Sequence, residues 1–450
     1  MPPQLSLGVH TFDGEKRVSA LSDYFSSNFS ASVNLVSPPP LQPVSPHSIS
    51  LISTSPNEVL KLLVALPENK ATGPDDIGSI FLRRTARCIY FPITIIFNRF
   101  FSSGIFPSSW KNANVIPILK SGRKNLVENY RPISILPLLS ILFERIIHNR
   151  LLSFTLSYIS PHQHGFLPGG SCLTNLSVLC HHIITAFENS SNLDVCYLDF
   201  SKAFDSVNHH LLRHKLEHRY NIHGPFLSLL SDFLSHRRQR VVLDGFASSS
   251  SPVPSGVPQG SVLGPLLFVL FIDDLVETVT SKGAKILLYA DDCKIFKIIE
   301  SAEDHNSLQL ALNAVESWCE LWHLKVNPSK SATMTFSLKR VVAPPVYHLG
   351  NDKINSVLSH KDLGVIFDTK LSFREHIHWV TSRCMSLVGI LFRFTEISDH
   401  LALKSFFSGC VTPILDYCSP IWQTATPSTL KSLNRPLNFF AAIVRLRVPS

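Results

Sequence analysis

Apolar residues recur along most of the chain at spacings that predict a mixture of helices and strands. Spacings of three to four residues predict amphipathic helices, and short apolar runs bounded by turn residues predict strands. The predicted helices cover residues 57–63, 80–101, 138–152, 173–187, 209–220, 266–275 and most of 371–450. The predicted strands cover residues 114–120, 194–199, 239–246 and 332–336, with a short pair within 360–368 and two more around residues 291 and 292. This mixture predicts an α+β protein.

Two adjacent carboxylates organise the candidate chemistry. Asp291 and Asp292 stand at a break between two apolar runs rich in β-branched residues, the composition of a tight hairpin between buried strands. Adjacent ionised carboxylates repel, and a bound cation would offset that repulsion. Mg²⁺ is expected because it takes hard oxygen ligands and keeps positions open for phosphate. A polar turn would explain the pair equally well.

A third carboxylate ends a separate apolar strand. Asp199 closes the predicted strand at 194–199, and an open sheet builds its site at such strand ends. We therefore expect Asp199 to join Asp291 and Asp292 as a metal ligand. Asp273 and Asp274 are a similar pair, but they close a helix and are not expected to bind the metal.

Basic and glycine-rich loops supply candidate contacts to phosphates. Lys120, Arg123, Lys124 and Arg131 surround one loop and could bind phosphates, although an ordinary solvated loop explains the first three equally well. A second loop, at 255–265, contains glycines that permit close backbone approach to a ligand. Gln259 in this loop offers both a donor and an acceptor. Asp205 is interpreted as acidic surface or the start of a helix.

Composition places the chain among globular proteins with a polyanionic partner. Its 450 residues carry 41 Lys+Arg against 33 Asp+Glu, a net charge of +8 that suggests nucleic acid without proving it. Nine scattered cysteines indicate reduced thiols rather than a disulfide framework or a zinc site. The N-terminus lacks a signal peptide, and the longest apolar run, 262–272, is too short to span a bilayer. We expect an intracellular protein, in the nucleus and cytoplasm, that makes no use of a membrane.

Three motifs together resemble the A, B and C motifs of reverse transcriptases. They are YLDFSKAFD at 197–205, GVPQGS at 256–261 and YADD at 289–292, in the order and separation of that family. Flanking motifs resemble the non-LTR (LINE-type) retrotransposon branch, in particular its jockey-like and CR1-like elements. They are YRPIS at 130–134, QHGF at 163–166, NPSK at 327–330 and LGV at 363–365. The resemblance runs from about residue 57 to residue 373.

The resemblance implies a right-hand polymerase with fingers, palm and thumb, in which an antiparallel palm sheet carries the catalytic carboxylates. It divides the chain into a partly disordered linker over 1–55, a fingers-rich part over 56–190 and a reverse transcriptase domain over 101–368. Within that domain the palm core would occupy about 191–340, and a thumb-like helical region would follow over 369–450.

The resemblance also implies roles for individual residues. Asp199, Asp291 and Asp292 would hold two Mg²⁺ ions, which Mn²⁺ can replace, for two-metal phosphoryl transfer. Lys330 would act as a proton donor to the pyrophosphate. The implied substrate-binding residues are Lys120, Arg131, Phe200, Phe204, Gln259 and Gly260. Phe204 matches the position whose ring excludes a ribonucleotide 2′-hydroxyl, although simple core packing would also explain it.

The implied activity is RNA-directed DNA polymerase, with an RNA template, a DNA primer or target and dNTPs as partners and the oligomeric state left open. A catalytically silent nucleic-acid-binding relic is the alternative, and an RNA-dependent RNA polymerase is disfavoured by YADD and Phe204. Complete elements carry an upstream endonuclease and many have Cys/His knuckles, but neither is evident here, nor is an RNase H acidic set after residue 373. Target cleavage is therefore not expected, and a 5′-truncated element copy would account for the difference.

Overall fold

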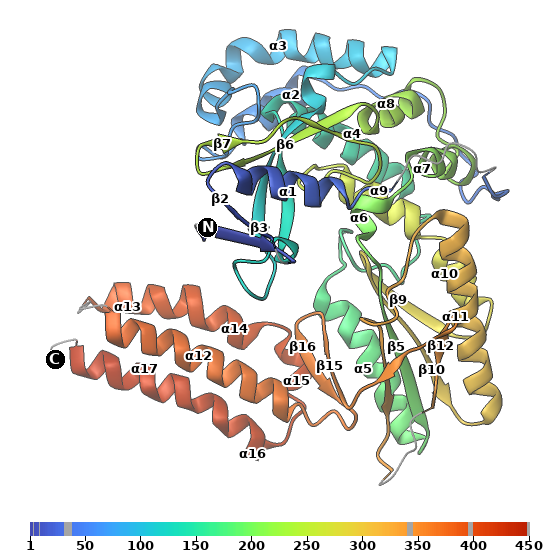
Figure 1. The fold of residues 1–450 in the computed structure, drawn as a ribbon, viewed down its shortest axis with the longest axis vertical. Helices are drawn as coiled ribbons and strands as arrows, with labels where there is room; N and C mark the ends of the chain where they lie inside the picture. The colour runs from blue at the N-terminus through green and yellow to red at the C-terminus, as the bar shows by residue number, and fades with distance from the viewer. Residues whose placement is uncertain (3, 9, 31–37, 340–344, 395–398, 448–450) are drawn as a thin grey trace. The chain divides into compact units, whose positions relative to one another are not determined.

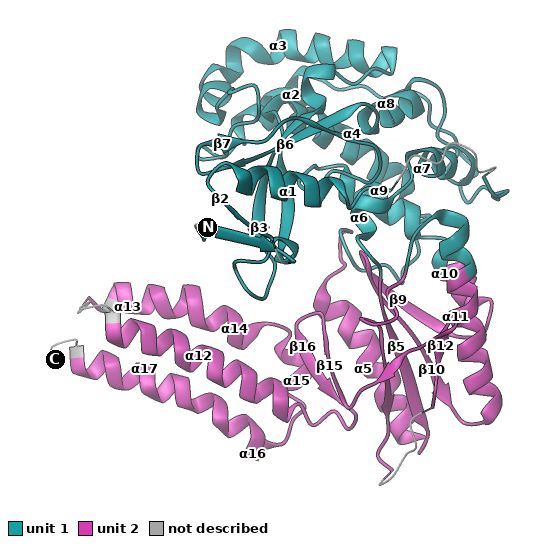
Figure 2. Ribbon diagram, in the orientation of Figure 1, with its two compact units in different colours: residues 1–166, 200–275, 317–325 teal, residues 167–199, 276–316, 326–450 magenta. Residues whose placement is uncertain are grey.

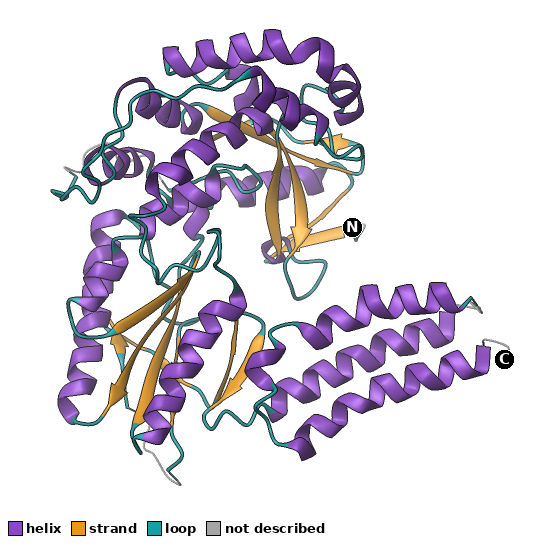
Figure 3. Ribbon diagram, turned by 180° about the vertical axis from the view of Figure 1, so that it is seen from behind, coloured by secondary structure: helices purple, strands orange, loops and turns teal. Residues whose placement is uncertain are grey.

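The computed structural model describes the chain except residues 3, 9, 31–37, 340–344, 395–398 and 448–450. The chain divides into two compact units, each assembled from several segments (Figure 2). The first unit contains residues 1–166, 200–275 and 317–325, and the second contains residues 167–199, 276–316 and 326–450. Both units combine helices with sheets, which confirms the α+β class (Figure 3).

The first unit contains a sheet with strand order β4-β3-β6-β7, and β8 also pairs with β6. β3 is antiparallel to β4 and parallel to β6, so the strands expected at 114–120 and 239–246 become neighbours. These strands are β3 Asn112–Leu119, β4 Tyr130–Ile135, β6 Arg237–Leu243, β7 Phe246–Ala247 and β8 Ser251–Val253.

Helices complete the first unit, and α3 lies at its outer edge in Figure 1. They are α2 Pro56–Val64, α3 Ser79–Ser103, α4 Leu138–Thr155, α6 Ala203–Ser206, α7 His209–His214, α8 Gly224–Leu234 and α9 Gly264–Ile272. The helix expected at 209–220 is α7 followed by a π-helical turn, Lys215–Arg219. The helix expected at 266–275 ends as α9 at Ile272, and α10, Leu275–Thr280, begins separately.

Regular elements occupy the first part of the N-terminal segment, before its Ser/Pro-rich stretch. It begins with strands β1, Gln4–Leu7, and β2, His10–Asp13, followed by helix α1, Lys16–Ser26. Val18, Leu21 and Phe25 lie on one face of α1 and are buried against residues of β3, β4 and β6. The amphipathic spacing of α1 therefore supplies part of the core of the first unit, whereas residues 31–37 of the expected linker lie outside the described residues.

The second unit is built on a sheet with strand order β14-β11-β5-β10-β9. Its central strand, β5, is antiparallel to both β10 and β11. The strands are β5 Asn192–Asp199, β9 Lys285–Tyr289, β10 Asp292–Ile299, β11 Ala332–Phe336 and β14 Asn355–Ser356. The long apolar runs of β5 and β10 are explained by burial on both faces.

One face of this sheet packs against helix α5, Cys172–Glu188. Leu193, Val195 and Tyr197 alternate along β5 and share a core with Leu176 and Ile183 of α5. The hairpin of β15, Ser359–Asp362, and β16, Val365–Asp368, contributes Val365 and Phe367 to the same core. This face carries the candidate site at one end.

The rest of the second unit is mainly helical. It contains α11, Ala302–Trp322, whose last residues belong to the first unit, and a short strand pair of β12, His348–Leu349, and β13, Asp352–Lys353. The helices that follow are α12 Arg374–Phe394, α13 His400–Phe406, α14 Thr412–Asp416, α15 Ser419–Trp422, α16 Pro427–Leu430 and α17 Asn434–Arg447. Val380, Val388 and Ile443 join α12 to α17 through a small core of their own. Among the described residues, no helix has both the length and the apolar character to cross a bilayer.

Candidate active site

The predicted hairpin around Asp291 and Asp292 is present between β9 and β10. Tyr289 and Asp292 are cross-strand partners, so Ala290 and Asp291 form the two-residue turn. Ala290 has a φ of +57°, which costs a non-glycine residue roughly 1–2 kcal/mol. Buried flanking residues such as Leu288 and Cys293 hold both strands in the sheet. The packed sheet thus maintains a strained turn at the carboxylate pair.

The register of the sheet places the third carboxylate beside this turn. Asp199, the last residue of β5, is the direct cross-strand partner of Asp292, the first residue of β10. Directly opposed residues on antiparallel strands have Cα atoms about 4.5–5.5 Å apart. Their side chains share one face of the sheet because strand side chains alternate. The structure therefore brings Asp199 and Asp292 together, with Asp291 adjacent in the chain.

The electrostatics of Asp292 suit a cation-binding role. The pKa of Asp292 is raised to about 6, and desolvation by neighbouring protein atoms is the largest cause although the residue is exposed at the end of its strand. The carboxylates of Asp291, Asp362 and Asp199 contribute to this rise in pKa, and Lys294 opposes it. This repulsion among oxygen donors is what a hard divalent cation would relieve, so the residues present fit such an ion. Among the described residues, no three His, Cys, Asp or Glu side chains already stand in metal-ligand geometry.

The backbone of Asp199 is anchored to the turn that carries Lys330. The Asp199 carbonyl accepts a hydrogen bond from the backbone N–H of Asn327 at 2.8 Å, and its N–H donates to Ser331 Oγ at 3.3 Å. Asn327 Oδ1 also accepts from the Ser329 hydroxyl, which closes the turn. Lys330 is exposed in this turn. Hydrogen bonds with Asn327 and Ser331 thus tie the turn that carries Lys330 to the backbone of Asp199.

The first unit holds the residues predicted to select the nucleotide. Phe204 lies in α6 and is half-buried, with its ring stacked on Phe268 at 4.4 Å between centroids and edge-on to Phe166 at 6.2 Å. The carbonyl of Phe204 accepts the backbone N–H of Val257 at 2.7 Å. A Cβ on Gly256 would lie only 2.6 Å from that carbonyl oxygen. Gly256 is therefore required for the loop at 255–265 to pack against α6.

Gln259 and Gly260 are held between α6 and strand β4. Gln259 Nε2 donates to Asp205 Oδ1 at 2.8 Å, and the Gln259 carbonyl accepts the Ser134 N–H at 2.7 Å. A Cβ on Gly260, which has a φ of +110°, would lie 2.5 Å from the Ser134 carbonyl oxygen. The pKa of Asp205 is raised to about 6, because the effect of burial exceeds the opposing effects of Gln259, Lys202 and Arg131. Asp205 lies in the first turn of α6, but it is half-buried and its side chain accepts a hydrogen bond from Gln259 instead of forming acidic surface.

The remaining predicted contacts lie on the same unit. Arg131 is exposed on β4, and Lys120 is exposed directly after β3. Ile118 of β3 is the cross-strand partner of Arg131 in β4, and Lys120 directly follows β3, two residues beyond Ile118. Both basic residues therefore lie where these neighbouring strands meet the loop between them. Phe200 is only 4% exposed, so its ring is buried and is not presented to a substrate.

Asp273 and Asp274 have partners of another kind. Lys215 Nζ donates to Asp274 Oδ1 at 2.6 Å, and Arg219 lies 3.4 Å from Asp273 Oδ2. Trp318 Nε1 also donates to Asp274 at 3.0 Å. These contacts neutralise both carboxylates inside the first unit, which agrees with their exclusion from the metal site.

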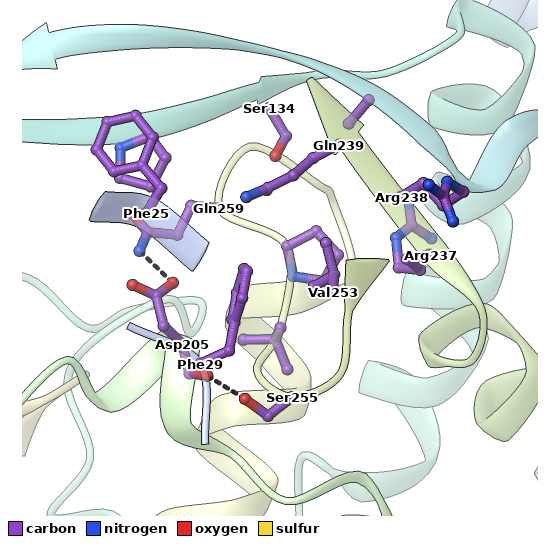
Figure 4. Close-up of a pocket in the computed structure, with 14 residues that line it drawn as sticks. Phe25, Phe29, Ser134, Asp205, Arg237, Arg238, Gln239, Val253, Ser255 and Gln259 are labelled. Carbon is purple, nitrogen blue, oxygen red and sulfur yellow. Dashed lines mark hydrogen bonds between the residues drawn. The ribbon is translucent and has the colours of Figure 1, made fainter. Parts of the chain in front are cut away.

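Two supporting features had no clear signal in the sequence. Glu144 of α4 is fully buried and accepts the Val262 N–H at 2.8 Å, which fixes the start of α9 just beyond Gln259. Burial raises the pKa of Glu144, while the nearby Arg237 lowers it. Figure 4 shows Phe25 and Phe29 beside Asp205 and Gln259 around a cavity of about 30 Å³. That size admits about one water molecule and excludes a nucleotide.

Comparisons with known proteins agree with this geometry. The family described as "Reverse transcriptase (RNA-dependent DNA polymerase)" matches residues 118–373, and the chain belongs to that family. The chain is 31% identical to the probable RNA-directed DNA polymerase from transposon X-element of Drosophila melanogaster, over 86% of the chain and 44% of that relative.

Relatives from mobile element jockey have the same degree of similarity. The chain is 31% identical to the RNA-directed DNA polymerase from jockey of Drosophila melanogaster, over 86% of the chain and 43% of the relative. The Drosophila funebris protein is 32% identical over 84% of the chain and 42% of the relative. The chain thus spans less than half the length of these relatives. The resemblance to jockey-like non-LTR elements is confirmed.

Proposed function

We propose that the chain is an RNA-directed DNA polymerase of a non-LTR retrotransposon, extending a primer 3′-hydroxyl with dNTPs on an RNA template. The observation that carries the proposal is the pairing of Asp199 with Asp292 at one end of a buried antiparallel sheet, with Asp291 in the adjoining turn. Family membership and the similarity to jockey proteins support the same activity. The silent relic is not favoured, because all three carboxylates are present.

The proposed fold is a right-hand polymerase. We assign the palm sheet to the sheet of the second unit, the fingers to strands β3 and β4 and the helices of the first unit before residue 167, and the thumb to the helices after residue 369. The expected boundaries at 101–368 and about 191–340 stay predictions. So do the location in nucleus and cytoplasm and the binding of a DNA target.

The three carboxylates would hold two Mg²⁺ ions, for which Mn²⁺ could substitute. When bound, such ions lower the pKa of the primer 3′-hydroxyl and neutralise charge on the triphosphate. The chain's own contribution is to fix Asp199 and Asp292 on rigid, paired strands, so that little reorganisation is needed during the reaction. Lys330, in the turn anchored to Asp199, would donate a proton toward the departing pyrophosphate.

The first unit would select and orient the nucleotide. Arg131 presents a guanidinium that can grip phosphate oxygens bidentately, and Lys120 adds a second positive charge. Gln259 is oriented by its hydrogen bond to Asp205. The ring of Phe204 is fixed on one side by Phe268, which would leave its other side to act as a steric gate against a 2′-hydroxyl.

Primer extension on a homopolymer template tests the proposal. The wild-type chain should extend oligo(dT) on poly(rA) with dTTP in the presence of Mg²⁺. Asp291→Asn should reduce the rate by roughly a hundredfold or more, because a ligand charge that stabilises the transition state is lost. Asp352→Asn, which changes an exposed carboxylate of β13 in the same unit, should leave the rate unchanged. A folded wild-type chain that binds template but never extends the primer would establish the silent relic instead.

A further inference from the structure

A buried ion pair lies directly behind the carboxylate site. Lys294 of β10 donates to Asp362 of β15, and their side chains are only 1% and 4% exposed. Lys294 is two residues beyond Asp292, so both side chains lie on the same face of the sheet. The charge of Lys294 is therefore buried next to the metal-binding carboxylates, and Asp362 is the partner that neutralises it.

The strand register places Lys294 in the cross-strand pair next to the one that contains Asp292. Lys294 is the cross-strand partner of Tyr197, as Asp292 is of Asp199, so the two partner pairs are consecutive on one face. The ring of Tyr197 stacks on His360 of β15 at 4.0 Å between centroids and an interplanar angle of 21°. His360 and Asp362 alternate along β15 and thus share one face of that strand.

Two contacts therefore attach β15 to the sheet immediately behind the carboxylates. One is the aromatic stack from Tyr197 and the other is the ion pair from Lys294. The charges of the pair also act on the Cys180 thiol of α5, whose pKa is raised mainly by burial, with Asp362 contributing to the rise and Lys294 opposing it. β15 continues through its hairpin into β16, whose Val365 and Phe367 are fully buried. The hairpin and the strands that carry Asp199 and Asp292 are thus packed as one body within the second unit.

Stability alone is a weak reason for such a pair. Removing two charges from water is costly, and hydrophobic replacements of buried ion pairs often stabilise a protein. The electrostatic effect of the pair extends further, because both charges are buried and Lys294 lies on the same face of β10 as Asp292, two residues away. A cation bound by Asp292 would be attracted by Asp362 and repelled by Lys294.

We propose that Lys294 and Asp362 are positioning residues for the carboxylate site, locking the β15–β16 hairpin behind it and balancing the charge that a bound divalent cation experiences. The electrostatic part rests on the proposed function, because it assumes that Asp199, Asp291 and Asp292 bind a divalent cation. The coupling between β10 and β15 does not depend on that assumption.

A four-member cycle tests both parts, with wild type, Lys294→Met, Asp362→Asn and the double variant. Each single variant leaves one buried charge uncompensated and should raise the unfolding equilibrium constant in metal-free buffer by roughly a hundredfold or more. The double variant removes both charges and should be at least about tenfold more stable than the product of the two single effects predicts. If the effects of the two single variants on the unfolding equilibrium constant simply multiply in the double variant, the proposed coupling between β10 and β15 is wrong.

Mn²⁺ binding, measured by electron paramagnetic resonance without nucleic acid, tests the electrostatic part. Lys294→Met leaves the negative charge of Asp362 and should tighten Mn²⁺ binding about fivefold or more, whereas Asp362→Asn leaves a positive charge and should weaken it to a similar degree. The double variant should return to within about twofold of wild type. Lys297→Met, on the same strand but paired with Asp304, is the matched control and should change nothing. Single variants that both weaken Mn²⁺ binding, or leave it unchanged, would overturn this part.

Hydrogen exchange keeps the proposal testable if the single variants fail to fold. In the wild-type chain, Mn²⁺ should slow amide exchange in β15 but not in the β12–β13 pair, which serves as the internal control. Equal responses in the two segments would contradict the coupling. A wild-type chain that shows the predicted Mn²⁺ pattern without primer extension would refute the polymerase proposal and leave this inference intact.

Discussion

The ring of Phe204 is packed against the core on one side and is only half-buried. Its stack on Phe268 is core packing, and its half-buried state leaves the remainder of the ring accessible. The α6 turn that carries it follows Asp199 by only a few residues, and the Val257 N–H holds its carbonyl. A rigid ring that is supported on one side is suited to exclude a substituent on a sugar.

We expect Phe204→Val to keep dNTP incorporation within an order of magnitude while rNTP incorporation rises. The discrimination ratio in kcat/KM should fall at least tenfold, about 1.4 kcal/mol, because a smaller side chain leaves room for the 2′-hydroxyl. Single-nucleotide incorporation with dTTP and UTP measures it.

A matched control shows whether a change in the discrimination ratio comes from lost core packing or from the lost steric gate. Phe233→Leu, which changes a fully buried ring of the first unit that packs on Phe106, should lower stability by about 1–2 kcal/mol while the discrimination ratio stays unchanged. If Phe204→Val lowers stability and leaves the ratio unchanged, Phe204 is only a core residue and the gate lies elsewhere.

Sequence motifs identified the residues that would meet substrate, but not those that support them. Asp199, Asp291 and Asp292 could be grouped because strand ends and turns have local signatures. Asp205, Glu144 and Asp362 have no such signature, because their roles arise from partners far away in the chain. A buried carboxylate is recognised by what surrounds it in three dimensions, and local sequence does not contain that information.

At the scale of elements, periodicity predicted most helices and strands well, while strand order came only from the structure. The parallel pairing of β3 with β6 and the position of β5 between β10 and β11 depend on long-range contacts. The N-terminal segment shows what composition leaves out. Its Ser/Pro-rich stretch follows α1, and one face of α1 is buried in the core of the first unit against residues of β3, β4 and β6, which lie far away in the chain.

The role of α1 can be tested with one pair of variants on that helix. Leu21→Ala removes a fully buried side chain and should lower the free energy of unfolding by about 2–5 kcal/mol. Asp23→Ala, which changes an exposed residue two positions further along, should stay within about 0.5 kcal/mol of wild type. Urea unfolding followed by circular dichroism measures both. Equal, small effects would mean that α1 is a detachable linker.

At the scale of the whole molecule, the carboxylates and the predicted nucleotide contacts belong to different compact units. The second unit carries Asp199, Asp291, Asp292 and Lys330, whereas the first carries Arg131, Phe204 and Gln259. Chain connectivity links the chemistry to the selection of substrate, because Asp199 ends β5 and Phe200 begins the next segment of the first unit. The account therefore depends first on whether the three carboxylates form one metal site.

Cleavage of the chain by a bound metal measures this most directly. Fe²⁺ replaces Mg²⁺ at oxygen-ligand sites and, with ascorbate and peroxide, generates hydroxyl radicals that cut the nearby backbone. The account predicts two groups of cuts, one next to Asp199 and one around Asp291 and Asp292, with both suppressed together by excess Mg²⁺. Asp292→Asn should weaken both groups, since Asp292 is shared by the site. Cuts centred on Asp273 and Asp274, or cuts at only one of the two predicted positions, would contradict the account.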